Sequence, residues 1–355
     1  MKITRANLLR GALASTALLP AAAFAASGGA GAFRSGAASG VPQAGNGPLR
    51  FAVIGDNTGI SRPGVFKQAM IQLSWLQPDF VLSVGDLIEG YTSDKAKIAS
   101  QWNAIEEAVA GLGRPFVYVP GNHDLNSKES VDAWHKRRGA TYYSFTYKGA
   151  LFLVLNTEDP PIQMPPQMSE QFYMAVDLMQ SDPEKAERLV AAQIDALTSR
   201  KSLPPESLAM AATNMGAKQL EWVRETLARH PNPKWTFVVM HKPVWKAPAD
   251  WGPELRASGL LPETVSPNFA KLRTLLAGRP YTVFAGHTHY YTHDVIDGRD
   301  YINMATTGGI RQHNGPGTLD HTMIVTLTDD GPVYANERFT GLMNIDGQTG
   351  QVLTY

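Results

Sequence analysis

Short apolar runs recur along the chain from about residue 48 onward, and a longer amphipathic stretch separates each run from the next. Apolar runs bounded by Gly, Pro or Asp are typical of buried strands. The runs that predict strands are Leu49–Gly55, Phe80–Gly85, Phe116–Val119, Leu151–Leu155, Trp235–Met240 and Tyr281–Ala285. The stretches that predict helices are Gly64–Leu76, Ala96–Leu112, Ala217–Arg229 and Phe269–Leu276. This alternation favours an α/β fold with a parallel-rich sheet covered by helices on both faces.

Two regions depart from this alternation. Residues 158–215 are rich in Pro and Met and contain one predicted helix, Pro183–Ser199, which indicates an insertion. Such an insertion either forms a lid over a site at the strand ends or packs on the surface, and the pattern favours neither. Towards the C-terminal end, Met323–Leu327 and Val333–Phe339 flank a turn and predict a second sheet packed on the first.

The N-terminal region is typical of an export signal. Three basic residues precede the apolar stretch Gly11–Phe24, which ends in the small-residue pattern Ala23-Phe24-Ala25. The stretch is shorter than the roughly 18 residues of a membrane-spanning helix. We therefore expect cleavage near Ala26, no stable membrane anchor afterwards, and a mature protein that is periplasmic or secreted.

Composition narrows the classes of partner and of metal site. The 32 basic and 32 acidic residues give a net formal charge of zero, so there is no overall positive field for bulk nucleic-acid binding. The chain has no cysteine, which leaves oxygen and imidazole nitrogen as metal donors.

The predicted organisation is a signal peptide (1–25), a flexible Gly/Ala/Ser-rich tether (26–47) and one folded domain (48–355). The oligomeric state is left open.

Residues of metal-binding type directly follow five of the predicted strands. In open α/β sheets the carboxyl ends of the strands form the crevice where ligands bind, so separate strands deliver these side chains to one place. They are Asp56, Asp86, Asn122, His123, His241, His287 and His289. Carboxylate, amide and imidazole donors suit Mn, Fe or Zn. Because the set exceeds one tetrahedral site, it predicts two divalent or trivalent ions, bridged by a carboxylate for which we favour Asp86.

Five short motifs carry a family resemblance. They are Gly55-Asp56, Gly85-Asp86-Leu87-Ile88-Glu89, Gly121-Asn122-His123-Asp124, Val238-Val239-Met240-His241 and Gly286-His287-Thr288-His289. In this order and spacing they resemble those of the calcineurin-like metallophosphoesterases, including the purple acid phosphatases. The resemblance implies a four-layer α/β/β/α sandwich of two mixed β-sheets flanked by helices, with a dinuclear metal site at the carboxyl ends of the strands.

The resemblance also implies a role for each residue. One metal ion is expected to be bound by Asp56, Asp86 and His289. The other is expected to be bound by Asp86, Asn122, His241 and His287. A metal-bridging hydroxide then attacks phosphorus, while Asn122 and His123 contact the phosphate and His123 protonates the leaving group. Asp124 is expected to assist catalysis by orienting His123.

Two positions depart from the family pattern. Many relatives have His two residues after the first Asp, where this chain has Thr58. Purple acid phosphatases have Tyr three residues after the second Asp, where this chain has Glu89. The first metal ion is therefore one expected ligand short, and Thr58, Asn57, Glu89 or water are candidates for that place. For Glu89, a loop cap bonded to backbone is the favoured interpretation.

The sequence thus predicts a secreted metal-dependent phosphoesterase that acts on small-molecule phosphate monoesters or diesters. One alternative is a non-catalytic ligand-binding protein that keeps the fold with an incomplete first metal site. Another is an unrelated two-metal hydrolase. The leaving group is not identified, although an aromatic set in the loops after the metal-binding strands either lines its pocket or packs in the core. That set is Trp245, Trp251, Tyr290 and Tyr291.

Overall fold

The computed structural model describes residues 47–163, 165–202, 211–313 and 315–339. The predicted signal peptide (1–25) and residues 26–46 of the predicted tether lie outside the described residues. None of the helices in the described ranges is both long enough and apolar enough to cross a membrane.

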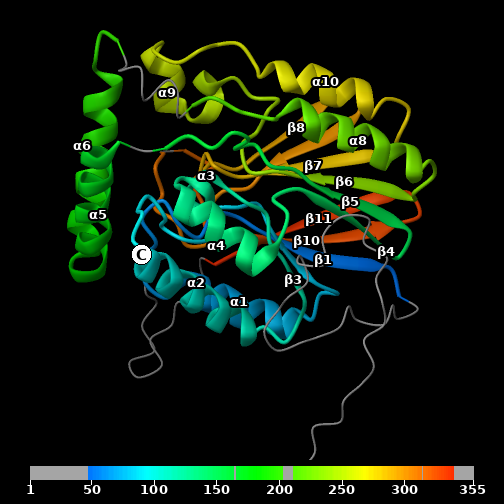
Figure 1. The fold of residues 1–355 in the computed structure, drawn as a ribbon, viewed down its shortest axis with the longest axis horizontal. Coiled ribbons are helices and arrows are strands. Elements are labelled where there is room, and N and C mark those ends of the chain that lie inside the picture. The colour runs from blue at the N-terminus through cyan, green and yellow to red at the C-terminus, as the bar shows by residue number, and fades with distance from the viewer. Residues whose placement is uncertain (1–46, 164, 203–210, 314, 340–355) are drawn as a thin grey trace, which may run out of the picture.

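Two β-sheets lie face to face in the middle of the molecule (Figure 1), with strand orders β11-β10-β1-β2-β3 and β4-β5-β6-β7-β9-β8. The first sheet consists of β1 (Leu49–Ile54), β2 (Val81–Ser83), β3 (Phe116–Val117), β10 (His321–Thr328) and β11 (Gly331–Arg338). The second consists of β4 (Tyr143–Tyr147), β5 (Ala150–Val154), β6 (Trp235–Val239), β7 (Tyr281–Ala285), β8 (Thr292–Ile296) and β9 (Arg299–Asn303). In the first sheet β1, β2 and β3 run parallel on one side, and β10 and β11 add antiparallel pairs on the other. In the second sheet β5, β6, β7 and β9 run parallel, and antiparallel β4 and β8 form the two edges, so both sheets are mixed.

Helices cover the outer face of each sheet. On the first sheet these are α1 (Val65–Leu76), α2 (Lys95–Ala110) and α4 (Lys128–Arg138). On the second they are α8 (Ala217–Arg229) and α10 (Pro267–Leu275). The shorter α3 (Asn122–Leu125), η1 (Pro248–Trp251) and α9 (Pro253–Ser258) lie in the segments that follow β3 and β6.

The side-chain alternation of the central strands produces the four layers. Phe51 and Val53 of β1 pack with Phe152 in the core between the sheets, whereas Ala52 and Ile54 pack with the helices outside. Successive side chains of a strand point to opposite faces. Because both faces are buried here, the strand is a continuous apolar run in the sequence. This arrangement confirms the predicted four-layer α/β/β/α fold class.

The predicted place of the C-terminal strands is wrong. Instead of starting a second sheet, β10 pairs antiparallel with every residue of β1 and so joins the first sheet. β11 pairs with β10 and forms the edge of the same sheet. The second sheet is built around β5, β6 and β7, whose apolar runs the sequence pattern does not separate from β1 and β2. A strand buried on both faces has the same apolar pattern in either sheet, and its pairing depends on contacts distant in sequence.

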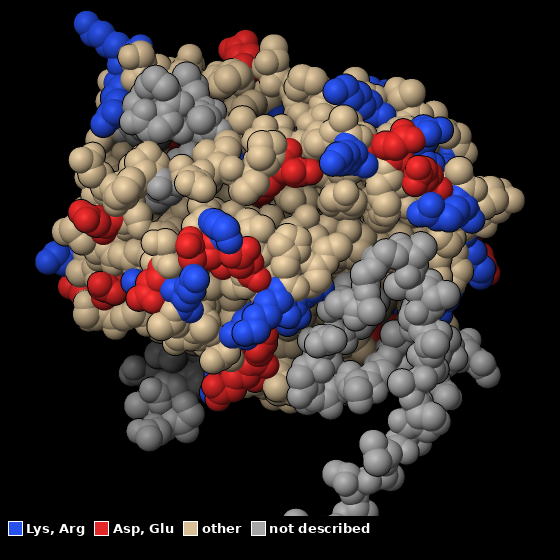
Figure 2. Space-filling model, in the orientation of Figure 1, with Lys and Arg blue, Asp and Glu red and all other residues tan. Residues whose placement is uncertain are grey.

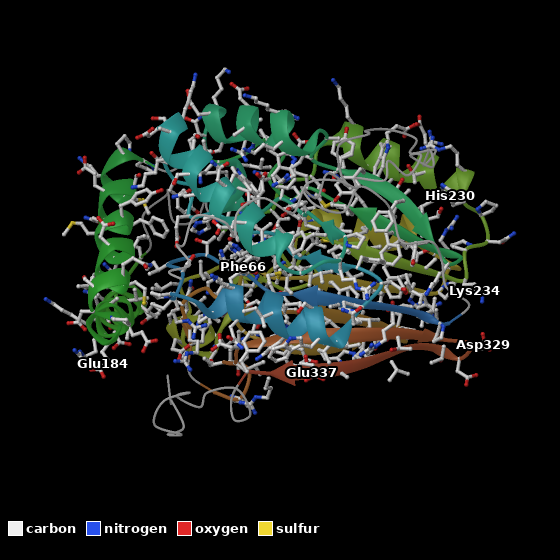
Figure 3. All side chains as sticks on the ribbon, turned by 90° about the horizontal axis from the view of Figure 1, so that it is seen from below. Phe66, Glu184, His230, Lys234, Asp329 and Glu337 are labelled. Atoms are coloured by element: carbon white, nitrogen blue, oxygen red, sulfur yellow. The ribbon has the colours of Figure 1, made fainter. Side chains whose placement is uncertain are left out.

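The predicted insertion, residues 158–215, contains two long helices rather than one: α5 (Pro166–Ser181) and α6 (Pro183–Thr198). They stand side by side at one end of the molecule (Figure 1, left edge). Glu184 marks this end in Figure 3, and Lys234 and Asp329 mark the opposite end. Ile60 and Ile310 from the main body join the apolar cluster of these helices, so the insertion packs directly on the loops at the strand ends.

Basic and acidic side chains are interspersed on the face that Figure 2 shows. This mixture accords with the zero net charge of the chain. A surface of this kind, on the face in view, presents no broad basic area of the type that binds a nucleic-acid backbone.

Candidate metal centre

The loops after five strands bring the seven residues of metal-binding type to one end of the two sheets. Four of them, Asp56, Asp86, His241 and His289, are almost completely buried. The structure thus assembles the group that the sequence predicts, and the roles of its members as ligands stay a prediction.

The closest cluster surrounds Nε2 of His241. This nitrogen lies 3.0 Å from Oδ2 of Asp86, 3.0 Å from Oδ1 of Asn122 and 3.1 Å from Nδ1 of His287. The ligand atoms of Asp86, His241 and His287 all lie within 4.8 Å of one another. The four atoms come from four different loops, so their proximity is a product of the tertiary fold.

The chemistry of this cluster fits a cation. Nδ1 of His241 lies 2.9 Å from the Val84 carbonyl oxygen. Because a carbonyl only accepts, Nδ1 donates to it, and Nε2 is the ring nitrogen that faces the other three atoms. Four electron-pair donors at hydrogen-bonding separations repel one another unless a proton or a metal ion lies between them. The set therefore matches the nitrogen and oxygen ligands of Zn, Mn or Fe.

A second pair of donors lies next to this cluster. Nε2 of His289 is 3.3 Å from Oδ2 of Asp56, and its Nδ1 is 2.6 Å from the Ile310 carbonyl oxygen. Oδ1 of Asp56 is buried without a hydrogen-bond partner among the described residues. A buried carboxylate oxygen is stabilised by hydrogen bonds or by a metal ion. The orphaned oxygen therefore fits a ligand position for the predicted first metal ion.

The two donor groups are joined through Asp86. The Asp86 carbonyl oxygen accepts from the N–H groups of Asn57 and Thr58, both at 3.1 Å, in the loop that follows Asp56. Oδ1 of Asp86 accepts the backbone N–H of His123 at 2.9 Å, while Oδ2 points to His241. The backbone of Asp86 thus ties the two loops together, and the bridging role of its carboxylate stays a prediction.

Strong electrostatic coupling holds the cluster together. Burial by itself would raise the pKa of Asp86, but the neighbouring His241 and His123 hold that pKa well below its usual range. Burial likewise opposes the charge on His241, yet Asp86 raises the pKa of His241 to about 9. Burial and the neighbouring His241 lower the pKa of His287. The site thus has an ionised carboxylate that favours a nearby cation.

The ring of His123 is held at the edge of the centre. Its Nδ1 lies 2.8 Å from the Glu89 carbonyl oxygen, and its Nε2 lies 3.9 Å from Oδ2 of Asp86. The ring packs against Tyr91 at 4.2 Å and against Phe172 of α5 at 5.4 Å between centroids. Nε2 is therefore the ring nitrogen on the side of Asp86.

The expectation that Asp124 orients the His123 ring is wrong, because the Glu89 carbonyl has that contact. Oδ1 of Asp124 accepts the N–H groups of Leu87 and Ile88, and its Oδ2 accepts the N–H of Gly121. Burial raises the pKa of Asp124 to about 7. Asp124 therefore holds together the two loops that carry Asp86 and Asn122, and acts on the site through the backbone.

Glu89 is a loop cap, as the favoured interpretation predicts. Its carboxylate accepts the Thr58 hydroxyl and the backbone N–H groups of Ile60 (3.1 Å) and Ser61 (2.6 Å). The Asn57 side chain donates to the Leu87 carbonyl oxygen at 2.8 Å. These contacts occupy the Glu89 carboxylate and the Thr58 hydroxyl, and they leave the amide oxygen of Asn57 and water as candidates for the further ligand of the first metal ion.

Strained backbone marks the same loops. Asp86, His287 and His289 have positive φ values of 53°, 71° and 53°. Residues with a Cβ seldom occupy this region, and those that do cluster at functional sites. Three of the seven residues of metal-binding type therefore lie in this region.

Sequence reasoning missed Tyr91 and a buried ion pair. The Tyr91 hydroxyl accepts from Nδ2 of Asn122 at 2.7 Å, and no motif marks that position. Lys242, the residue after His241, has its Nζ 3.0 Å from Oε2 of Glu158, and both side chains are about 1% exposed. The sequence signal for this pair is weak, because 83 residues separate a Lys and a Glu that look like surface charges.

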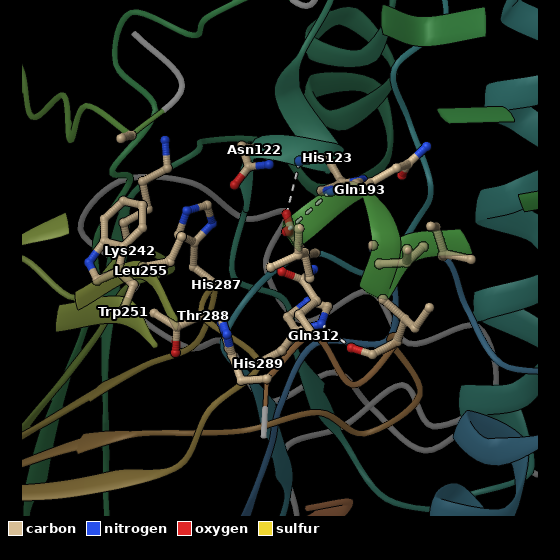
Figure 4. A pocket seen from close by; sticks show the side chains of 18 of the residues that line it. Asn122, His123, Gln193, Lys242, Trp251, Leu255, His287, Thr288, His289 and Gln312 are labelled. Atoms are coloured by element: carbon tan, nitrogen blue, oxygen red, sulfur yellow. Dashed lines mark hydrogen bonds and ion pairs between the residues drawn. The ribbon is translucent and has the colours of Figure 1, made fainter. Parts of the chain in front are cut away.

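A cavity of about 390 Å³ opens beside the metal-binding residues. Figure 4 shows Trp251 and Leu255 on one side and Gln193 on the other, with His287 and His289 between them. Of the four predicted aromatic residues only Trp251 lines this cavity, at 4.7 Å from the His287 ring. Trp245 packs in the core of the second sheet instead.

The comparison of sequences places the chain in a family. The sequence profile of the calcineurin-like phosphoesterases matches residues 49–291, which is more than half of the chain. The chain belongs to the calcineurin-like phosphoesterase family. This finding confirms the resemblance carried by the motifs, and it excludes the alternative of an unrelated two-metal hydrolase.

Curated relatives match a smaller part. Serine/threonine-protein phosphatase CPPED1 of Danio rerio is 32% identical over 99 residues, which are 26% of this chain and 32% of the relative. The Homo sapiens protein of that name is 33% identical over 87 residues, 23% of this chain and 27% of the relative. The chain thus spans less than a third of the length of the curated relatives it matches.

Solved structures share the fold. A dimetal phosphatase from Danio rerio has a TM-score of 0.53 at 13% identity, over 82% of this chain and 97% of that chain. A purple acid phosphatase from yellow lupin seeds has a TM-score of 0.52 at 14% identity, over 87% of this chain and 53% of that chain. At these identities the likeness shows the fold alone.

Proposed function

We propose that this chain is a metal-dependent phosphoesterase that binds two metal ions and hydrolyses small-molecule phosphate monoesters or diesters. The observation that carries the proposal is the convergence of donor atoms from Asp86, Asn122 and His287 on Nε2 of His241. The name of the CPPED1 relatives and the family of the chain support the same activity.

Each residue of the site has a proposed role in metal binding or in catalysis. Asp86, Asn122, His241 and His287 would hold one ion, and Asp56, Asp86 and His289 the other. When bound, the ions would supply a water-derived nucleophile near neutral pH and neutralise charge on the phosphoryl group. Because Nδ1 of His123 donates to the Glu89 carbonyl, only the doubly protonated ring has a proton on Nε2. In that form His123 would orient the ester and give this proton to the departing alkoxide.

The test combines metal content with hydrolysis. Purified protein is loaded with Mn, Zn or Fe, its metal content is measured by mass spectrometry, and turnover is followed on an aryl phosphomonoester and an aryl phosphodiester. We expect two ions per chain and metal-dependent turnover of at least one ester. The preferred ester decides between phosphatase and phosphodiesterase.

Three variants sharpen this test. His123→Ala should keep the metal and lose about 10²- to 10⁴-fold in turnover, as expected for a general acid. Asp86→Ala should lose both metal and turnover. His135→Ala is the matched control, because this exposed ring bonds only locally to the Gly139 carbonyl oxygen. Bound metal without turnover of either ester would contradict the enzyme and favour the non-catalytic alternative.

We also propose that the protein works in the periplasm or outside the cell. The support is the basic and apolar pattern of residues 1–25. N-terminal sequencing of the exported protein should find a start near Ala26. An unprocessed chain confined to the cytoplasm would contradict this location.

A further inference from the structure

The outer part of the cavity is more apolar than phosphate binding requires. Much of its wall consists of apolar residues of α5, α6, η1 and α9 and of the neighbouring loops. Those side chains are Ile162, Phe172, Val190, Ile194, Trp251, Leu255, Leu260 and Leu261. At about 390 Å³ the cavity lies in the range of roughly 300–1,000 Å³ that holds organic ligands.

Apart from Lys242, none of the described residues of this wall is a Lys or Arg that could bind an anionic group of a substrate. Among the described residues that line the cavity, Lys242 is the one Lys or Arg, and its Nζ is bonded to Glu158 at 3.0 Å and to the Ala212 carbonyl oxygen at 2.9 Å. Nδ1 of His313 lies 3.0 Å from Glu254. The remaining polar side chains of the outer part are neutral: Gln193, Thr198, Ser258 and Gln312.

Burying an anionic leaving group in this wall is therefore unfavourable. A charged group loses its hydration on entering an apolar site and regains it only through a partner of opposite charge. An apolar group is stabilised there by the release of its surface from water. The composition of the wall thus discriminates between leaving groups by charge.

We propose that the substrate is a phosphate ester of an uncharged, apolar alcohol, whose leaving group lies between α6 and α9. This inference rests on the proposed function of the site. In the reaction, the bond from phosphorus to the alcohol oxygen breaks and a bond from phosphorus to a water oxygen forms. The alkoxide takes a proton from His123, and the products are the alcohol and phosphate.

The first experiment varies the length of the leaving group. Metal-loaded protein is assayed with ethyl, butyl, hexyl and octyl phosphate. Each buried methylene contributes about 0.8 kcal/mol, so kcat/KM should rise by up to about fourfold per methylene until the cavity is filled. We expect hexyl phosphate to exceed ethyl phosphate by at least about tenfold.

Binding gives a readout that does not depend on turnover. Alkylphosphonates of the same lengths cannot be hydrolysed, and their binding is measured by calorimetry at several temperatures. Affinity should increase with chain length, with a negative heat-capacity change that grows in step, because apolar surface is being buried.

Two variants test whether the dependence of kcat/KM on chain length arises from the apolar residues that line the cavity. Ile194→Gln in α6 and Leu255→Gln in α9 should each lower the hexyl-to-ethyl ratio of kcat/KM by about fivefold or more. Leu189→Gln is the control, because Leu189 is an exposed residue of the same helix α6 and does not line the cavity. This control should leave the ratio unchanged.

The outcomes separate the two proposals. Turnover that does not increase with chain length would overturn the apolar substrate and leave the phosphoesterase standing. Absence of turnover for every ester, with metal bound, would overturn the phosphoesterase. In that case phosphonate binding still tests whether the cavity favours apolar groups. Equal affinity for ethylphosphonate and hexylphosphonate would overturn the inference.

Discussion

The Asn122 amide donates to the Tyr91 hydroxyl at 2.7 Å, and this bond turns the amide oxygen to within 3.0 Å of Nε2 of His241. The orientation of a potential ligand is thus fixed by a residue outside the donor cluster. Partners of this kind set the direction and basicity of metal ligands. The Tyr91 ring also packs on His123, so one side chain supports two residues of the site.

Replacement of Tyr91 by Phe should weaken metal binding. Tyr91→Phe keeps the ring contacts but removes the acceptor that orients Asn122. We expect metal affinity to fall by about 10- to 100-fold, measured by competition with a chelator. Tyr142→Phe, in a ring that packs on Trp222, is the control. Equal metal affinity in both variants would show that Asn122 is oriented without Tyr91.

An added methyl group at Gly85 should disrupt the centre. Gly85 has a φ of 104°, and a Cβ there would lie 2.7 Å from Nδ1 of His241 and 3.0 Å from the backbone nitrogen of Gly121. Gly85→Ala should therefore displace His241 and abolish tight metal binding. Gly113→Ala is matched, because Gly113 also has a positive φ, 63°, but open space around it.

The control separates strain from collision. Gly113→Ala should lower the free energy of unfolding by about 1–2 kcal/mol through backbone strain alone and leave metal content unchanged. Urea denaturation and metal analysis compare the two variants. If Gly85→Ala affects stability and metal content no more than Gly113→Ala does, the close approach of His241 does not exclude a side chain at position 85.

Replacing only one partner of the buried pair Lys242 and Glu158 should strongly lower the free energy of unfolding. Burial raises the pKa of Glu158, and Lys242 opposes that rise. Lys242→Met leaves Glu158 buried without its partner, and we expect a loss of about 3–5 kcal/mol in the free energy of unfolding. The double variant Lys242→Met/Glu158→Leu should recover much of this loss, as urea denaturation would show.

An exposed pair provides the comparison. Lys128 and Asp132 face each other on the surface of α4, so Lys128→Met should change stability far less than Lys242→Met. Similar losses for the two variants would mean that the internal pair is effectively solvated.

His321 should make the fold sensitive to acid. Its Nδ1 lies 2.8 Å from Oδ1 of Asn336, and its Nε2 accepts the Ala305 N–H at 3.0 Å. Burial lowers its pKa to about 4, below the unfolded value of about 6.5. The unfolded chain therefore binds the proton first, and the stabilising effect is complete above pH 6.5 and is lost as the pH falls from 6.5 towards 4.

The slope from this one group is up to about 1.4 kcal/mol per pH unit. It is measured by urea denaturation at several pH values. His321→Gln should be less stable at pH 7 and should lose less stability between pH 6.5 and 4 than the unchanged protein. Parallel curves for the two proteins would rule out His321 as the titrating group.

Much of the site was predictable because family motifs and strand ends are local in sequence. The motif Gly286-His287-Thr288-His289 shows its donor residues and the glycine that precedes them without any knowledge of the fold. The role of Tyr91 was not predictable, because it depends on one hydrogen bond to Asn122, which lies in another loop. The same is true of the Glu89 carbonyl, which replaces Asp124 as the partner of His123.

The class of fold and the family follow from apolar runs and short motifs, because these depend on neighbours along the chain. The same motifs name the residues of metal-binding type that the structure brings together, and their role as ligands stays a prediction. Three features appear only when the chain is folded: β10 and β11 extend the first sheet, residues of α5 and α6 line the cavity, and Lys242 pairs with Glu158. Strand partners, cavity walls and buried ion pairs are contacts between distant residues. Their free energies arise when segments pack together, so no local pattern records them.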